Sequence, residues 1–99
     1  MINGTTSTGF RYEFDETRLD DMRFVDVLAV VVDPDAPRFD KISGASKLLT
    51  MLLGPEMKQA LYQHIGKDHG GRVPRADLEK ALAEIMQSKD AEKNFSSSP

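Results

Sequence analysis

The chain has 99 residues, of which 39% are hydrophobic and 29% charged, and this balance predicts one small globular domain. Its 13 basic and 16 acidic side chains give a net charge of −3, which argues against a free-standing nucleic-acid-binding protein, because such proteins neutralise phosphates with clustered Lys and Arg. The absence of cysteine excludes disulfides and cysteine-ligated metal. The longest mostly apolar run, residues 48–55, is too short to span a membrane, and residues 1–6 lack a signal-peptide pattern, so we expect a cytoplasmic chain.

The first expected element is a short N-terminal β-hairpin. Aromatic and charged residues alternate over residues 10–14, which is typical of a strand with one buried face, and the aromatic ones are Phe10, Tyr12 and Phe14. The polar segment 4–9 begins and ends with glycine and suits a turn that joins this strand to a first one around Ile2.

A helix is predicted over residues 17–32, capped at its start by Asp15 or Thr17. The stripe expected to face the core recurs at helical spacing and consists of Leu19, Met22, Val25, Leu28, Ala29 and Val32. The β-branched residues 30–32 are more typical of a strand and weaken this prediction. The prolines of segment 33–37 end the helix, because each disfavours helical geometry in the residue before it.

Three further helices are expected after this connector. The first ends at Gly54 and buries Phe39, Ile42, Ala45, Leu48, Leu49 and Leu52. The second begins at Pro55, since proline suits the first position of a helix, and buries Met57, Ala60, Leu61, His64 and Ile65. The third begins at Pro74 and buries Leu78, Ala81, Leu82, Ile85 and Met86.

The sequence therefore predicts a mainly α fold, with about four helices and a short N-terminal β-hairpin. These elements form a single domain over residues 1–88, followed by a polar, flexible tail over residues 89–99. Charge is uneven: residues 1–35 hold eight acidic and three basic side chains, a net charge of −5, whereas residues 36–99 hold eight acidic and ten basic, a net charge of +2. Such asymmetry indicates either a solvated acidic face or attraction between the two parts or between copies of the chain.

Two segments, 24–32 and 48–53, are apolar on more than one face. Each helix of a small domain buries one wide face, so the surplus indicates either a central helix or a surface for a partner. The candidate partner-binding residues are Phe24, Val27, Val31, Leu48 and Leu52.

No residue pattern indicates catalysis. His64 and His69 are five residues apart, which matches neither one helical face nor a two-histidine zinc motif. The glycine-rich loop 66–71 lacks the Gly-Lys-Ser/Thr ending of a phosphate-binding loop, and Asp33 and Asp35 stand among prolines without the glutamate of a calcium loop. We therefore expect no enzyme activity, no cofactor and no metal site.

Several short features follow one another along the chain: Ile2-Asn3-Gly4 before the aromatic strand, Leu19-Asp20-Asp21-Met22 at a helix start, Leu-Leu-Gly-Pro-Glu at 52–56, Gly-Arg-Val-Pro at 71–74, and Lys93-Asn94. In this order and spacing, over nearly the whole chain, they resemble the tail assembly chaperones of long-tailed bacteriophages and prophages. The chain departs from that pattern at Phe95, where serine is usual after Lys-Asn. It departs again in segment 33–40, whose two prolines alter the connection between the first two helices.

The resemblance implies a helical, non-catalytic protein of the bacterial host cytoplasm that is absent from the mature virion. Such a protein binds the tape measure protein, keeps it soluble and helps to recruit tail tube subunits. A homo-oligomer is compatible with this role, and neither nucleic acid nor a membrane is an expected partner. Surplus apolar surface suits the role, because a tape measure protein is a long helix-rich chain with apolar stripes to cover.

The resemblance also implies a longer product made by a −1 ribosomal frameshift, which would carry the domain that engages tube subunits. Glu92-Lys93-Asn94 can be encoded GAA-AAA-AAC, where the Lys and Asn tRNAs can re-pair one base back. Two other functions stay open, a small helical DNA-binding regulator and a structural head–tail connector subunit. The connection 66–73 is longer than the turn of a helix-turn-helix, which disfavours the regulator.

Overall fold

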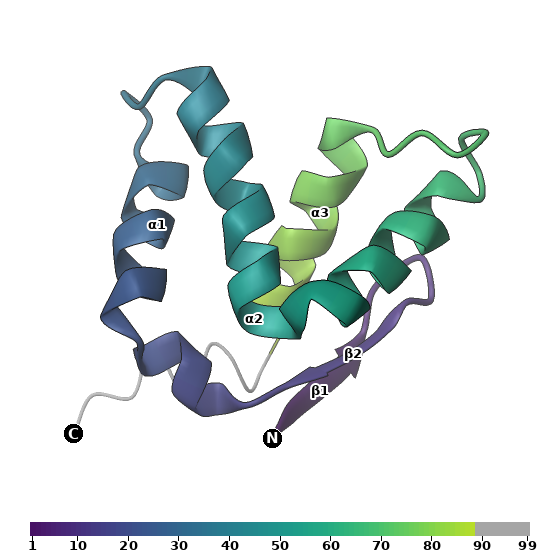
Figure 1. Ribbon diagram of the computed structural model, residues 1–99, viewed down its shortest axis with the longest axis horizontal. Coiled ribbons are helices and arrows are strands. Elements are labelled where there is room, and N and C mark those ends of the chain that lie inside the picture. The colour runs from purple at the N-terminus through teal and green to yellow at the C-terminus, as the bar shows by residue number, and fades with distance from the viewer. Residues whose placement is uncertain (89–99) are drawn as a thin grey trace.

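In the computed structural model, which describes residues 1–88, an N-terminal hairpin precedes three α-helices (Figure 1). The elements are strands β1 (Ile2–Thr5) and β2 (Arg11–Phe14), the 3-10 helix η1 (Glu16–Asp20), and helices α1 (Met22–Val32), α2 (Arg38–Gly66) and α3 (Arg75–Met86). The mainly α fold with a hairpin is confirmed. The predicted tail and the residues Glu92, Lys93 and Asn94 lie outside the described residues.

The hairpin forms where the alternating pattern predicts it. Strands β1 and β2 are antiparallel, with Ile2 opposite Phe14, and their buried side chains are Ile2, Tyr12 and Phe14. In the turn, the backbone N–H of Thr6 donates to the carbonyl of Phe10 at 2.8 Å, and the Thr6 hydroxyl accepts from the Phe10 N–H at 3.1 Å. Gly9 completes the turn at a φ of 95°, in the left-handed region that favours glycine.

The predicted helix over residues 17–32 is two helices, so that prediction is wrong in its first part. Asp15 caps η1 by accepting from the backbone N–H of Thr17 at 2.9 Å. The chain then becomes extended at Asp21, whose carboxylate caps α1 by accepting from the N–H of Arg23 at 2.9 Å. The second cap starts a new helix with its own axis, because an extended N-cap residue interrupts the helical ladder.

Three α-helices are present in the described residues, not about four, because the second and third predicted helices join. Helix α2 consists of two helical segments that meet at Gly54, whose φ of 81° and ψ of 163° are non-helical and produce a sharp kink, visible in Figure 1 where the two halves of α2 meet. Pro55 follows the kink and has no N–H to donate, so the ladder is broken at the point where the axis turns. The most deeply buried side chains of α2 lie on both sides of the kink: Leu48, Leu49, Leu52 and Leu61.

Helix α3 begins after Pro74 as predicted, and its buried stripe is Leu78, Ala81, Leu82 and Ile85. The preceding loop returns the chain across the end of α2. Gly70 and Gly71 have φ values of 64° and 92°, and Gly66 packs so closely that an added Cβ would lie 3.3 Å from the carbonyl carbon of Gly71. This loop places α3 alongside both the kinked helix and the hairpin.

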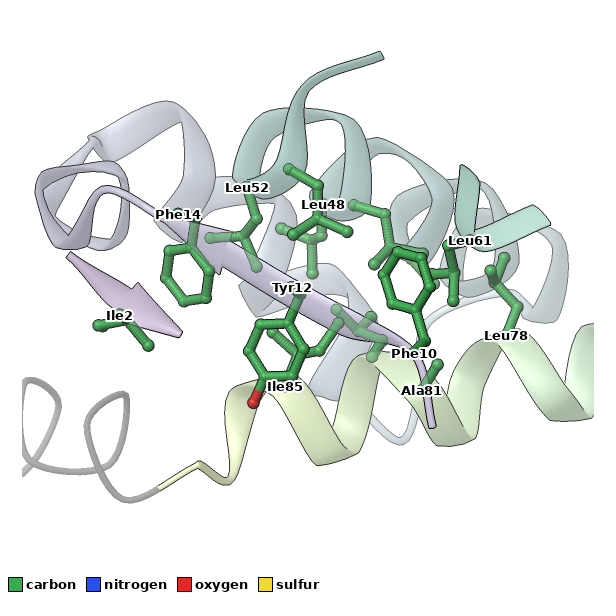
Figure 2. Packing of buried hydrophobic residues seen from close by; sticks show 14 of the residues in the cluster. Ile2, Phe10, Tyr12, Phe14, Leu48, Leu52, Leu61, Leu78, Ala81 and Ile85 are labelled. Atoms are coloured by element: carbon green, nitrogen blue, oxygen red, sulfur yellow. The ribbon is translucent and has the colours of Figure 1, made fainter. Parts of the chain in front are cut away.

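The core lies between the hairpin and helices α2 and α3. Figure 2 shows the aromatic rings of Phe10 and Tyr12 directed toward side chains of the two helices. Phe10 also meets the ring of His64, with centroids 5.6 Å apart. Aromatic rings bury the largest apolar areas of any side chains, so the short hairpin contributes much of the core.

Candidate partner-binding surface

Helix α1 has apolar residues all round. Of its 11 residues only Arg23 and Asp26 are polar, and a helix of this composition is normally covered on every side. Among residues 1–88, however, α1 is packed mainly against the first half of α2, and Figure 1 shows it at the edge of the molecule. One of its faces is therefore buried and the other is not.

The inner face of α1 contains Phe24, Val27 and Val31. Phe24 is completely buried, and the two valines are half-buried against Gly44 of α2. An added Cβ at Gly44 would lie 2.7 Å from Cγ2 of Val31 and 3.5 Å from Cγ1 of Val27. Glycine at this position lets the two helices approach closely.

The five candidate partner-binding residues do not form a surface. Phe24, Leu48 and Leu52 have 0% exposure, and Val27 and Val31 face α2, so we correct that assignment. Segment 48–53 lies in a central, buried part of α2, which was the other alternative left open by the sequence; in α1 the two faces are exchanged, because the face expected in the core is the exposed one. The physical reason is size: burying the Phe24 ring removes more apolar area from water than burying the smaller side chains on the opposite face.

The outer face of α1 holds the stripe that the sequence assigned to the core. Met22 and Val32 are 64% and 65% exposed, Ala29 is exposed and Val25 is half-buried. That assignment was wrong for these residues, whereas Leu19 is buried through η1 and Leu28 is half-buried against the core. We call Met22, Val25, Ala29 and Val32 the α1 stripe. Phe39 and Ala60 of α2 were also expected in the core, and both are exposed, Phe39 at 77% in the first turn of the helix.

Aspartates border the α1 stripe along its length. Asp21 precedes Met22, Asp26 follows Val25 and Asp33 follows Val32, and all three side chains are exposed. Asp33 accepts a hydrogen bond from the N–H of Asp35 at 2.9 Å, which ends α1 in a turn. The stripe thus has Asp26 on one side and a capping aspartate at each end, whereas Leu28 lies on its other side, and the spacing of these aspartates in the sequence was a signal of this arrangement.

A groove of about 440 Å³ lies beside the inner face, between α1 and α3. Val31 and Val32 line one wall, Leu82 and Met86 line the other, and Ala45 of α2 lies between them. This groove and the α1 stripe share only Val32, so they are distinguishable by substitution.

A polar cleft of about 150 Å³ joins the hairpin turn to helices α2 and α3. The backbone N–H and the hydroxyl of Ser7 donate to the carboxylate of Glu84 at 2.7 and 2.6 Å, and these hydrogen bonds, the hydroxyl's foremost, hold the pKa of Glu84 below its usual range. Nε2 of His64 lies 3.1 Å from the carbonyl oxygen of Thr8. No sequence signal could pair Ser7 with Glu84, which are 77 residues apart.

Both histidines make contacts that hold the fold together, His64 with Thr8 and His69 with Asp77. Nε2 of His69 lies 2.6 Å from a carboxylate oxygen of Asp77, across the loop between α2 and α3. Within residues 1–88 no three His, Asp or Glu side chains gather as a metal site would require. The polar contacts around the cleft therefore hold the hairpin turn against helices α2 and α3.

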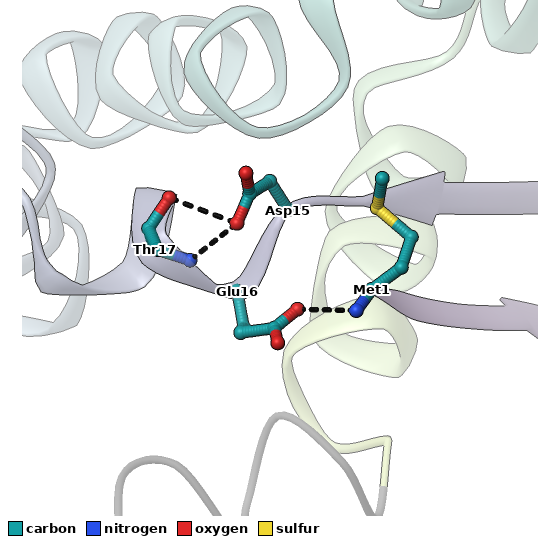
Figure 3. Close-up of polar contacts among 4 residues, drawn as sticks. All are labelled: Met1, Asp15, Glu16 and Thr17. Carbon is teal, nitrogen blue, oxygen red and sulfur yellow. Dashed lines mark hydrogen bonds and ion pairs between the residues drawn. The ribbon is translucent and has the colours of Figure 1, made fainter.

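At the other end of the hairpin, the N-terminal ammonium of Met1 forms an ion pair with Glu16 at 2.6 Å (Figure 3). This hydrogen-bonded contact lowers the pKa of Glu16. The backbone and side-chain hydrogen bonds from Thr17 likewise lower the pKa of Asp15. Both ends of the hairpin are thus tied to helical segments by carboxylates.

Comparison of the chain with known protein families, curated proteins and solved structures found no match. Within the described part of the chain, none of the helices has the length and apolarity that crossing a bilayer demands.

Proposed function

We propose that the chain is a non-catalytic assembly chaperone of a bacteriophage or prophage tail, which binds the tape measure protein in the cytoplasm of the bacterial host. The observation that carries this proposal is the exposed α1 stripe, an apolar face on a helix whose other face packs against α2. Such a face is suited to pair with an apolar stripe of another helix. The resemblance in residue order supplies the identity of that helix.

Recruitment of tail tube subunits belongs to the longer frameshifted product in this proposal. Reading the codons at Glu92, Lys93 and Asn94 tests that part, because GAG at 92 or AAG at 93 breaks the heptamer A-AAA-AAC. A −1 frame that closes within a few codons would also contradict it. An open frame after the heptamer is the expected result.

The binding function is tested by co-expressing the full chain with the tape measure protein of the same genome. We expect the tape measure protein to remain in the soluble fraction with the wild-type chain and to precipitate with Ala29→Asp, because a buried unpaired charge opposes the interface. Ala60→Asp is the matched control, since Ala60 is an exposed alanine on α2. A tape measure protein that is equally insoluble with and without the wild-type chain would contradict the function.

Mass spectrometry of purified particles separates this proposal from a structural connector. A chaperone leaves before the tail is complete, so the chain should be absent from particles, whereas a connector subunit would be present. The DNA-binding alternative has less support, because Glu79 and Glu84 occupy the helix that would follow the turn of a helix-turn-helix.

A further inference from the structure

The α1 stripe has the spacing of a helix-pairing seam. Met22, Val25, Ala29 and Val32 follow one another at intervals of three, four and three residues, as the a and d positions of a heptad repeat do. Over the 11 residues of α1 this seam is about 16 Å long. Ala29 is small and lies near the middle, so a second helix can approach closely there.

Acidic residues lie along one side of this seam and at both of its ends. In the heptad numbering that places Met22 at a, Asp26 occupies the e position and Leu28 the g position, while the extended capping residues Asp21 and Asp33 lie at the two ends of the seam. Arg23 lies about 100° around the helix from Met22, outside the positions that face a paired helix. Residues 20–35 hold five acidic and one basic side chain, a net charge of −4.

The net negative charge around the α1 stripe distinguishes two kinds of partner that could cover it. A second copy of the chain, paired through its own α1 in either orientation, would bring acidic flanks against acidic flanks, because no basic residue occupies an e or g position. A different helix with Lys or Arg beside its apolar residues would instead neutralise Asp21, Asp26 and Asp33. The C-terminal end of α1 favours the same partner, since a cation there interacts well with the helix dipole.

We propose that the α1 stripe binds one helix of another protein, whose a and d residues are apolar and whose e and g residues are basic. This inference deepens the proposed function, because it states the chemistry of the tape measure segment that the chain would cover. It rests on that function only for the identity of the partner, and its test uses no tape measure protein. Failure of one test is therefore distinguishable from failure of the other.

The probe is a synthetic peptide of about four heptads, with Ile at a, Leu at d, and Lys at every e and g. A second peptide has Glu at e and g and is otherwise identical. Like charges at these positions keep each peptide from pairing with itself. Binding to the full, isotopically labelled chain is followed by amide chemical shifts, which report both affinity and location.

We expect the Lys peptide to shift amides of α1 and to bind at least about tenfold more tightly than the Glu peptide, a difference that falls as salt screens the charges. Ala29→Asp should weaken binding of the Lys peptide at least about tenfold, whereas Ala60→Asp should not change it. Far-UV circular dichroism and urea unfolding test whether both variants are folded. If Ala29→Asp is unfolded, Met22→Ser replaces it as the stripe variant.

Three results would overturn the proposal. Equal binding of the two peptides, or no binding of either, would refute the proposal that the partner helix is basic. Loss of binding in Ala83→Asp but not in Ala29→Asp would move the site to the groove between α1 and α3, which Ala83 lines. A wild-type dimer in sedimentation equilibrium that Ala29→Asp dissociates would show that a second copy covers the stripe.

Discussion

The rotation of α1 about its axis decides which of its two apolar faces is available, and Gly44→Ala tests that rotation. In an exposed helix, replacing glycine with alanine stabilises by about 1 kcal/mol, because alanine loses less backbone entropy on folding. At Gly44 the added methyl carbon would lie 2.7 Å from Cγ2 of Val31, closer than carbon atoms normally approach. The two effects oppose each other.

The steric effect should win. Valine in a helix is nearly confined to one rotamer, so Val31 cannot turn its methyl group away without strain, and α1 must shift. Overpacking of this kind costs about 1–3 kcal/mol. Subtracting the gain in helix propensity, we expect Gly44→Ala to lower the free energy of unfolding by roughly 0–2 kcal/mol.

Urea unfolding of a double-mutant cycle isolates the contact. Gly44→Ala should become stabilising by about 1 kcal/mol in a Val31→Ala background, because the opposing methyl group is gone. Ala60→Gly, at an exposed helical position, calibrates the propensity effect alone. If Gly44→Ala stabilises the wild-type chain by the full propensity value, the inner face of α1 does not pack on Gly44, and the assignment of both faces fails.

Three further substitutions test the fold around this surface. Glu84→Gln should reduce the loss of stability at acid pH. The pKa of Glu84 is lowered in the folded chain, so the hydrogen bonds that it accepts from Ser7 stabilise the fold above the ordinary pKa of 4.5. That contribution is lost as the pH falls through the pKa of the folded chain. Urea unfolding at pH 7 and pH 3 should show a larger loss for the wild type than for the variant, and equal losses would contradict the contact. Gly54→Ala should destabilise by about 1–3 kcal/mol, since φ 81° with ψ 163° is a glycine conformation, and a neutral effect in thermal unfolding would mean that α2 is not kinked there. Leu52→Ala should lower the free energy of unfolding by about 2–5 kcal/mol, because Leu52 has no exposed area. Thr50→Ala, at an exposed position, should have little effect. A small loss of stability in Leu52→Ala would place that side chain outside the core.

Local patterns predicted most of the fold. The alternation at Phe10, Tyr12 and Phe14 predicted the hairpin, and Pro74 predicted the start of α3, because each signal acts within a few residues. The break at Asp21 was missed because its carboxylate caps a helix only when the backbone of Asp21 itself is extended. Gly54 was recognised as a breaker, but whether its two helices count as one depends on the hydrogen bonds around the kink.

The candidate surface could not be predicted from periodicity, because α1 carries two apolar stripes of similar strength. The sequence does not state which stripe meets α2. That choice depends on Gly44, which lies in another helix and accepts the inner valines at close range, and on the burial of the Phe24 ring. Contacts such as Ser7 with Glu84 are likewise set by the packing of distant elements.

The stripe stays open because α2 packs on the inner face of α1, where Gly44 meets Val27 and Val31. Beyond the kink at Gly54, the second half of α2 turns away from α1 and runs beside the hairpin (Figure 1), and within residues 1–88 no element covers the outer face of α1. Because Met22, Ala29 and Val32 remain exposed, they contribute little apolar burial to the free energy of unfolding of the isolated domain. Substitutions on the stripe should therefore change binding without unfolding the chain, and selection can adapt these residues to a partner helix while Phe24 and Gly44 hold the scaffold.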